Sequence, residues 1–306
     1  MTPLRYIDPH QMQNPRWLFW TPTLIWASTW HVILYQLAET PALTAVAWRF
    51  ALAASLLAAV AVNRRQSLRV PWRVHGWMVL TGALQYGLNY CSVYVAEQTI
   101  PSGLVAVLFS LMVFFNALAG SLLFGRPLTL RFSLCALLGV AGVVAIFWPE
   151  VLAASARPLA SVGLGWGLLA VACACTGNVL TLKLTARGLK LVPVLAWCMG
   201  YGALSLVLVA GVSGVSLAPG HSGAWWASLV YLAGFGTVLA FLAYFRLSQM
   251  EGPGRAALTS VVIPVIALAV SAALEGWRPQ TLSYLGGMLC LGSVWWATRP
   301  AAVSGL

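Results

Sequence analysis

Polar side chains recur at helical spacing inside long apolar runs of the sequence. Gln85 and Asn89 lie four residues apart in one run, and Ser28 and His31 lie three apart in another. Each pair therefore shares one face of a helix. Hydrogen-bonding groups at membrane depth face protein or water rather than lipid. We expect a cavity that binds a small molecule, lined by Ser28, Trp30, His31, Gln85, Tyr86, Asn89, Tyr90, Asn178 and Tyr244.

The polar residues of this set also have a plain structural alternative. Each polar residue could instead make an interhelical hydrogen bond, which stabilises by about 0.6 kcal/mol on average. His31 lies near the middle of its run and could titrate or orient a substrate. A neutral, hydrogen-bonded histidine is the simpler interpretation of this residue.

Arg49 is the one charged residue in the stretch AVAWRFALAASLL, residues 45–57. An arginine at the centre of a membrane helix costs about 2.5–3.5 kcal/mol on insertion scales. Its guanidinium could hold the carboxylate of an amino acid. We favour a structural role, in which Arg49 bonds carbonyl groups or helix ends of neighbouring helices.

The sequence argues against an enzyme. Ser28 and His31 share a helix face, but no acidic residue is placed to orient the histidine. Neither a zinc signature nor a Gly-rich nucleotide loop occurs. The six cysteines lie in apolar runs and have neither disulfide nor metal-ligand spacing. We expect no catalytic residue, no metal and no cofactor.

The composition places these residues in an all-α integral membrane protein. Of the 306 residues, 60% are hydrophobic and 8% are charged, whereas a globular chain is about 25% charged. Turn residues and charges divide the chain into ten apolar runs of about 20 residues, the length that spans a bilayer. The predicted spans are 17–37, 42–62, 74–96, 101–124, 129–148, 162–183, 192–213, 224–246, 254–275 and 280–298. We expect the first run to be a retained helix, since no cleavage site follows it.

The distribution of basic residues predicts the topology. Most of the 17 Lys and Arg residues flank the spans on one side of the predicted membrane, so both termini are expected in the cytoplasm. The net charge of +11 is therefore a topology signal, and we expect no nucleic-acid partner.

The second half of the chain repeats the first. AWRFALAASL at 47–56 aligns with AWCMGYGALS at 196–205, and TIPSGLVAVL at 99–108 aligns with EGPGRAALTS at 251–260. Each half holds five predicted spans, so the second half enters the membrane from the opposite side. Inverted repeats are typical of secondary transporters, whose halves move around a site near the bilayer midplane.

These segments resemble the EamA-type branch of the drug/metabolite transporter superfamily, in order and spacing, over nearly all of 17–298. The resemblance rests on WASTW (26–30), AWRF (47–50), PSGLVAVLFSL (101–111), LFGRPLTL (123–130) and LEGWRPQTL (274–282). It implies ten helices in 5+5 form and export or exchange of small metabolites, often amino acids. It also implies a cavity lined by helices 1, 3, 4, 6, 8 and 9, with helices 5 and 10 at the periphery. Within the family, the chain is similar to the bacterial amino-acid exporters (YddG-type).

No Asp or Glu lies in the middle of a predicted span, and Glu39, Glu97, Glu150 and Glu275 are all at span ends. A proton antiporter for hydrophobic cations would need a carboxylate within the membrane. We therefore predict an exporter or facilitator of neutral or aromatic amino acids that works by alternating access without an intramembrane carboxylate. The alternatives are another metabolite or drug class (nucleotide sugar, sugar phosphate or cationic drug) and, more distantly, an intramembrane enzyme.

The predicted organisation follows from the spans and the repeat. It comprises a cytoplasmic N-terminal tail (1–16), a first five-helix repeat (17–148), an extracytoplasmic linker (149–161), a second, inverted repeat (162–298) and a C-terminal tail (299–306). We expect a monomer in the lipid bilayer of the bacterial inner membrane, with a small-molecule substrate as its partner.

Overall fold

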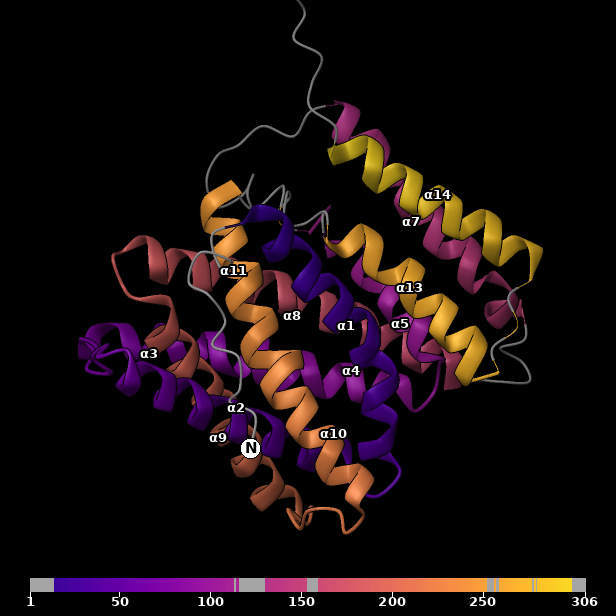
Figure 1. The fold of residues 1–306 in the computed structure, drawn as a ribbon. Coiled ribbons are helices and arrows are strands. Elements are labelled where there is room, and N and C mark those ends of the chain that lie inside the picture. Colours follow the sequence, from indigo (N-terminus) through magenta and orange to yellow (C-terminus); the bar gives the residue numbers. More distant parts are fainter. Residues whose placement is uncertain are drawn as a thin grey trace, which may run out of the picture.

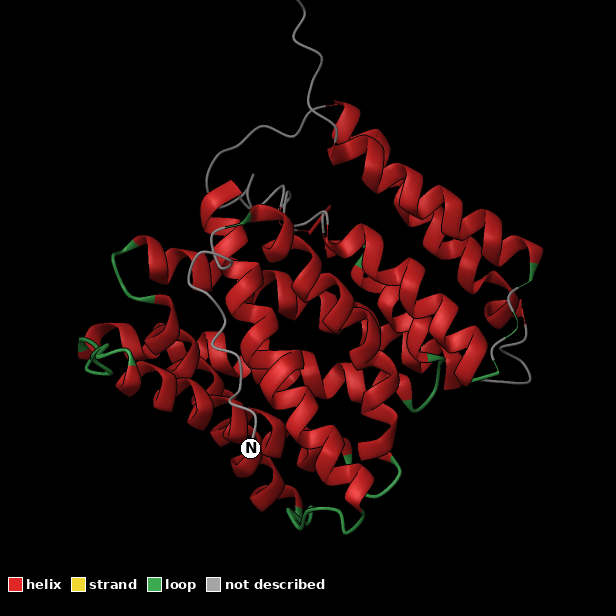
Figure 2. Ribbon diagram, in the orientation of Figure 1, coloured by secondary structure: helices red, strands yellow, loops and turns green. Residues whose placement is uncertain are grey.

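The computed structural model describes a helical protein. It covers residues 14–112, 114–115, 130–152, 159–251, 256, 259–276, 278 and 280–298. Helices and connecting loops make up this part of the chain, and no strand occurs in it (Figure 2).

The helices of the first half begin at residues that favour helix starts. Asn14 caps the first of them, because its side chain accepts a hydrogen bond from the backbone N–H of Arg16 at 2.9 Å. Pro15 opens the same helix, and a proline directly precedes three others, at Pro41, Pro71 and Pro101. The elements are α1 (Pro15–Leu37), α2 (Ala42–Asn63), α3 (Trp72–Thr81), the π-helix η2 (Gly82–Leu88), α4 (Asn89–Glu97), α5 (Ser102–Phe109) and α7 (Leu130–Leu152).

The helices of the second half follow the same plan. Gly214 ends one of them in the left-handed conformation, with φ of 67°, which glycine adopts without strain. The elements are α8 (Leu159–Ala186), α9 (Leu191–Ser213), α10 (Gly223–Ala233), the π-helix η4 (Gly234–Leu239), α11 (Ala240–Glu251), α13 (Thr259–Leu274) and α14 (Thr281–Thr298).

Each predicted span overlaps helical structure. α3, η2 and α4 run on without a break as one long segment, and so do α10, η4 and α11. The fourth span, 101–124, begins with α5, and its residues 116–124 lie outside the described part. The same holds for residues 1–13, 153–158 and 299–306 of the predicted tails and linker.

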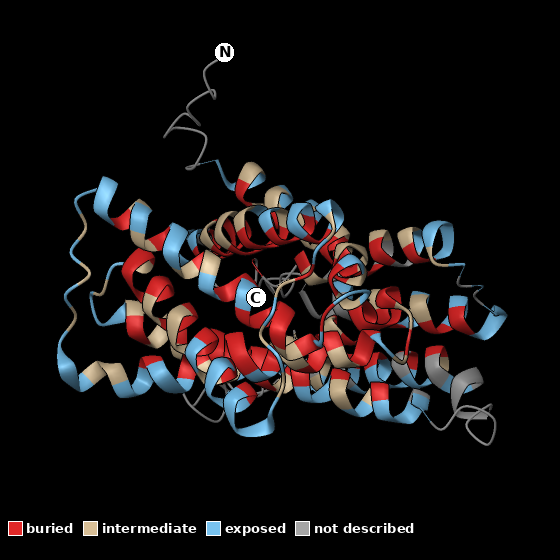
Figure 3. Ribbon diagram, turned by 90° about the horizontal axis from the view of Figure 1, so that it is seen from below, coloured by how far each residue is buried: buried red, intermediate tan, exposed pale blue. Residues whose placement is uncertain are grey.

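Several helices have the length and apolar composition needed to cross a bilayer. Within the described residues there are four, Ala42–Asn63, Ser161–Ala186, Leu191–Ser213 and Gly223–Met250. Buried residues gather toward the middle of the bundle, and exposed ones lie at its edges (Figure 3). Many exposed side chains are large and apolar, such as Val212 and Leu137, which is the surface that lipid requires.

The two π-helices occupy matching positions in the two halves. Gly234 follows Gly82 by 152 residues, the separation that also relates Pro253 to Pro101 in the aligned segments. A π-helix shifts the hydrogen bonds from i→i+4 to i→i+5 and is frequent at functional sites. Each half therefore carries the same local irregularity in its third predicted span.

Helix packing also matches between the halves. α1 packs against α11 and α13, and its counterpart in the second half, α8, packs against α4 and α5. The counterparts α2 and α9 lie along each other, as do α7 and α14. The α7–α14 pair forms one edge of the bundle, at the upper right of Figure 1. This edge position is the one that the family resemblance implies for the fifth and tenth helices.

The tryptophans of the repeated phrase make equivalent hydrogen bonds. Trp48 Nε1 donates to the carbonyl of Leu217 at 2.9 Å, and Trp197 Nε1 donates to the carbonyl of Leu68 at 2.8 Å. Leu217 follows Leu68 by 149 residues, which is also the separation of Trp197 from Trp48. The tryptophan of α2 therefore binds the loop after α9, and the tryptophan of α9 binds the loop after α2. This reciprocal contact is a physical reason for the repeated tryptophan.

Replacing either tryptophan by phenylalanine is expected to lower the free energy of unfolding by about 1 kcal/mol, the usual net value of one hydrogen bond. The two losses should be similar, because the two bonds are equivalent. Thermal unfolding of the purified protein in detergent measures this, with Trp72→Phe as the control, since Trp72 is 86% exposed. A loss at only one of the two positions would contradict the equivalence.

Candidate functional site

A cavity lies between the helices that carry most of the predicted polar residues. It encloses about 90 Å³ for the centres of water-sized molecules, room for several waters or a small solute. Its walls come from α1, η2, α4, α5, α8, α11 and α13, together with Arg49 from α2. These are the six membrane-spanning segments that the family resemblance implies, with α2 added.

Arg49 is almost completely buried in the wall, with 1% of its surface exposed. Its Nε donates to Thr237 Oγ1 at 3.0 Å, Nη1 to the Tyr94 hydroxyl at 3.4 Å, and Nη2 to the Gly236 carbonyl at 3.5 Å. The guanidinium carbon also lies 4.6 Å from the centre of the Tyr90 ring, a cation–π contact. These contacts to a carbonyl and to hydroxyls of neighbouring helices are the kind that a structural role requires.

The π-helix η4 supplies the acceptor for Arg49. The Gly236 carbonyl also accepts a hydrogen bond from Trp26 Nε1 at 3.1 Å, so one backbone oxygen serves α1 and α2 together. A Cβ at position 236 would lie 2.8 Å from the Thr29 methyl group. Glycine therefore lets η4 approach α1 closely enough for these bonds to form.

Arg49, in the cavity wall, retains unused donor capacity. A guanidinium has five N–H donors, and the three bonds above leave one N–H on each Nη nitrogen. No carboxylate lies within 4 Å of it in the described part of the chain, where His31–Glu275 is the ion pair found. The hydrogen bonds and ring contacts of the guanidinium are therefore made with hydroxyls, one carbonyl and the rings of Phe50 and Tyr90.

Three amide side chains lie in the same wall. Gln85 Nε2 donates to Asn178 Oδ1 at 3.2 Å, and Asn89 Nδ2 donates to the backbone carbonyl of Gln85 at 3.1 Å. The side-chain oxygens of Gln85 and Asn89 (Oε1 and Oδ1) are buried without a hydrogen-bond partner, and so is Trp30 Nε1. A buried polar atom without a partner costs free energy. Gln85 Oε1 packs against Gly177 of α8, where a Cβ would collide with it.

The structure brings most of the predicted site residues to this cavity. Those that line it are Trp30, Arg49, Gln85, Asn89, Tyr90, Asn178 and Tyr244. The lining also includes residues that the sequence analysis missed, among them Trp26, Thr29, Phe109, Met112, Phe241 and Ser260. Most of the missed residues are apolar or aromatic, and an apolar residue in an apolar run carries no signal of its own.

Three predicted residues lie elsewhere. Ser28 bonds the Tyr231 hydroxyl at 2.7 Å, and Tyr86 is fully buried with its ring against Phe50 and Phe241. His31 turns toward Glu275. Ser28 and His31 lie on the side of α1 that packs against α10 and the end of α13, and the cavity lies on another side of this helix.

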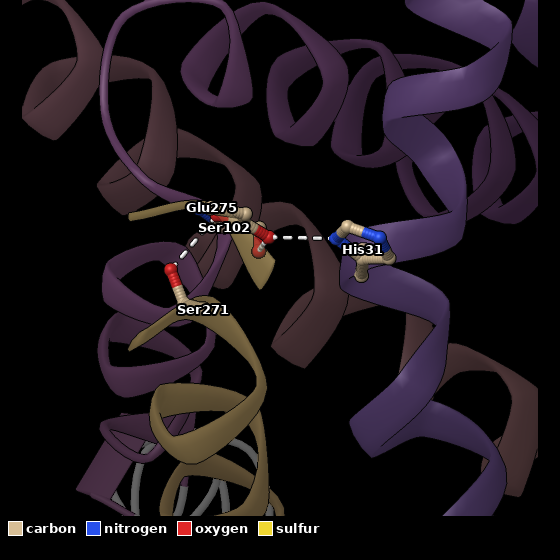
Figure 4. A network of polar contacts seen from close by, with 4 residues as sticks. All are labelled: His31, Ser102, Ser271 and Glu275. Carbon is tan, nitrogen blue, oxygen red and sulfur yellow. Dashed lines mark hydrogen bonds and ion pairs between the residues drawn. The ribbon is translucent and has the colours of Figure 1, made fainter. Parts of the chain in front are cut away.

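His31 belongs to a polar network at the predicted outer side (Figure 4). Its Nδ1 lies 3.2 Å from Glu275 Oε1, and Ser271 Oγ donates to Glu275 Oε2 at 2.8 Å. The backbone N–H and the hydroxyl of Ser102 also donate to Glu275. Glu275 therefore joins α1, α13 and the start of α5.

Glu97 is a residue whose environment the sequence did not reveal. It is the last residue of α4, yet only 7% of its surface is exposed. Both carboxyl oxygens are buried without a hydrogen-bond partner. A place at the end of a predicted span therefore does not mean contact with water, and the protein does enclose a carboxylate near its cavity.

No metal centre is evident in the described part of the chain, where no group of three or more His, Cys, Asp or Glu side chains could hold an ion. The cavity wall combines one guanidinium, amide side chains, indole rings and other aromatic side chains.

Known proteins share this fold and sequence pattern. The EamA-like transporter family matches residues 17–148 and 161–299. The chain is 29% identical over 263 residues to the uncharacterised inner membrane transporter YedA of Escherichia coli K12, which covers 85% of this chain and 81% of that protein. The YedA proteins of strains O6:H1 and O157:H7 match to the same extent.

A solved crystal structure has the same arrangement of helices. It matches with a TM-score of 0.65 at 21% identity, covering 92% of this chain and 95% of the other, and this likeness shows the fold alone. The family match and the inner-membrane relatives together show that the protein is a multi-pass transporter of the inner membrane. From its first apolar run to its last, the chain belongs to the EamA-like transporter family.

Proposed function

We propose that this transporter moves neutral amino acids, aromatic ones in particular, by alternating access between two inverted five-helix halves. Arg49 carries the proposal, because it presents two unused N–H groups in a cavity wall without a carboxylate beside it. A carboxylate accepts two parallel hydrogen bonds from such a fork. The bound substrate would supply the negative charge that Arg49 lacks.

The remaining polar atoms fit the other end of a zwitterion. An ammonium group donates three hydrogen bonds, and the side chain of Asn89 in the cavity wall has an acceptor without a partner, its Oδ1. Trp26, Trp30, Phe109 and Phe241 give the walls an apolar, aromatic character that favours a large side chain.

Other substrate classes fit the cavity less well. A nucleotide sugar or sugar phosphate carries more charge than one arginine balances, and Arg49 is the one Lys or Arg among the lining residues described. A cationic drug would be repelled by the same guanidinium. The indole and amide groups bind by hydrogen bonding and show no arrangement of nucleophile and base for an enzyme.

Matching features of the two halves support alternating access. The π-helices, the tryptophan hydrogen bonds and the packing of α1 and α8 recur with the offset of the sequence repeat. In such transporters the two halves rock about a central site. Because both halves lie in one chain, we propose that a monomer with cytoplasmic termini suffices.

Contacts at the predicted outer side are consistent with closure there. Glu39, in the loop after α1, accepts hydrogen bonds from the Ser222 side chain and from the backbone N–H groups of Ser222 and His221. These bonds, that from the Ser222 side chain first, hold the pKa of Glu39 below its usual value. The ionised carboxylate thus ties the loop after α1 to the start of α10.

Counterflow in liposomes tests the substrate. We expect saturable exchange of radiolabelled phenylalanine that is inhibited by unlabelled phenylalanine but not by its amide or by phenethylamine, which both lack the carboxylate. Inhibition by all three would contradict the role of Arg49. Exchange of a nucleotide sugar, a sugar phosphate or a cationic dye, with none of phenylalanine, threonine or methionine, would overturn the substrate class.

A further inference from the structure

The buried carboxyl group of Glu97 has no assigned role in substrate recognition. Neither oxygen has a hydrogen-bond partner, and no cation lies within 4 Å of it in the described chain. Transferring an unpaired carboxylate into such an environment is very costly, and a group of this kind is neutralised by a proton instead. Geometry alone therefore favours the neutral acid in this conformation.

The charged groups around Glu97 are few. It interacts electrostatically with Glu275 and Arg49, and its charge is also felt by the Tyr94 hydroxyl. Glu275 is satisfied by Ser102, Ser271 and His31 and can therefore stay ionised. A second negative charge beside it is unfavourable, which adds to the preference for a proton on Glu97.

Arg49 connects this group with the cavity. The guanidinium attracts either an ionised Glu97 or the carboxylate of a substrate, and a negative charge on Glu97 weakens its attraction for the substrate. Binding of a carboxylate at Arg49 and of a proton at Glu97 should therefore favour each other. Such coupling is reciprocal, since each ligand changes the affinity for the other by the same factor.

We propose that Glu97 is the proton-binding site of this transporter and that a proton is bound together with the substrate. The identity of the substrate in this inference rests on the proposed function. The proton site rests instead on the burial of Glu97. The proton comes from the solution that the open cavity faces, and it is released on the other side when water reaches Glu97. This differs from the expectation, based on the sequence, of transport without an intramembrane carboxylate.

Infrared spectroscopy tests the proton site without any substrate. We expect the carbonyl band of a protonated carboxylic acid in the wild-type protein at neutral pH, its loss in Glu97→Gln and its retention in Glu39→Gln. Glu39 is the matched control, because it is an exposed and ionised carboxylate of the same chain. Absence of this band from the wild type would overturn the proton site whatever the protein transports.

Binding and transport of phenylalanine test the coupling. We expect the wild type to take up protons when phenylalanine binds at alkaline pH, where part of the substrate-free protein has lost the proton of Glu97. We also expect a pH difference of one unit to drive accumulation of up to about tenfold for one proton per substrate. In Glu97→Gln, exchange should persist while proton uptake and accumulation are lost, and Glu39→Gln should keep the pH dependence of the wild type. Proton-driven accumulation by Glu97→Gln would overturn the coupling role. A wild type that shows the infrared band but binds no amino acid would overturn the proposed substrate and still support the proton site.

Discussion

Replacing Arg49 by alanine is expected to reduce phenylalanine exchange at least about a hundredfold. Two hydrogen bonds to a charged group contribute about 1.5–3 kcal/mol each, and about 2.7 kcal/mol corresponds to that factor. Alanine also removes the bonds to Thr237, Tyr94 and Gly236, so the variant should be less stable as well. Initial rates of counterflow in liposomes measure the first effect, and thermal unfolding in detergent measures the second.

Lysine at the same position separates recognition from stability. Arg49→Lys keeps the charge but cannot form the two parallel bonds of a guanidinium. We expect a loss of about tenfold or more in apparent affinity for phenylalanine, while the protein stays folded. Arg73→Ala, a change at an exposed arginine on α3, is the control and should transport normally. Unchanged affinity in a folded Arg49→Lys protein would mean that Arg49 is only structural.

Replacing Gly82 by alanine is expected to have the largest effect on the contact between the two halves. A Cβ at this position would collide with the Cys198 carbonyl of α9 and lie 2.9 Å from the Gly202 nitrogen. The contact is between backbones, so no flexible side chain can move aside. Overpacking of this kind costs about 1–3 kcal/mol. Because η2 begins at Gly82 and carries Gln85, we expect transport to fall together with stability.

Gly76→Ala is the matched control for this change. Gly76 lies in α3 of the same continuous segment, and a Cβ there would meet nothing within 4 Å. Alanine is a better helix former than glycine by about 1 kcal/mol, so this variant should be as stable as the wild type or slightly more stable. Thermal unfolding and counterflow are compared for the two variants. Equal stability of both would show that α9 does not depend on the small residue at position 82.

The sequence alone determined the helical, membrane-spanning character of the protein. Apolar runs of bilayer length predict helices, and the structure has helical elements at all of these runs. The repeat also followed from the sequence, and the matching hydrogen bonds of Trp48 and Trp197 give a physical reason for the separation of 149 residues between them. Both signals are readable because they depend on residue type and on distance along the chain.

The tertiary structure alone decided which polar residues meet. Helical spacing placed Gln85 and Asn89 on one face but could not identify Asn178 of α8 as the partner, because a face of a helix does not specify its neighbour. For the same reason, His31 turns to Glu275 instead of the cavity. Burial of Glu97 is set by what surrounds the end of α4, which its place in the sequence does not contain. The surrounding helices decide whether a charged residue at a helix end contacts water or is enclosed by protein. In water such a residue only marks the topology, whereas a carboxyl group enclosed by protein can bind a proton.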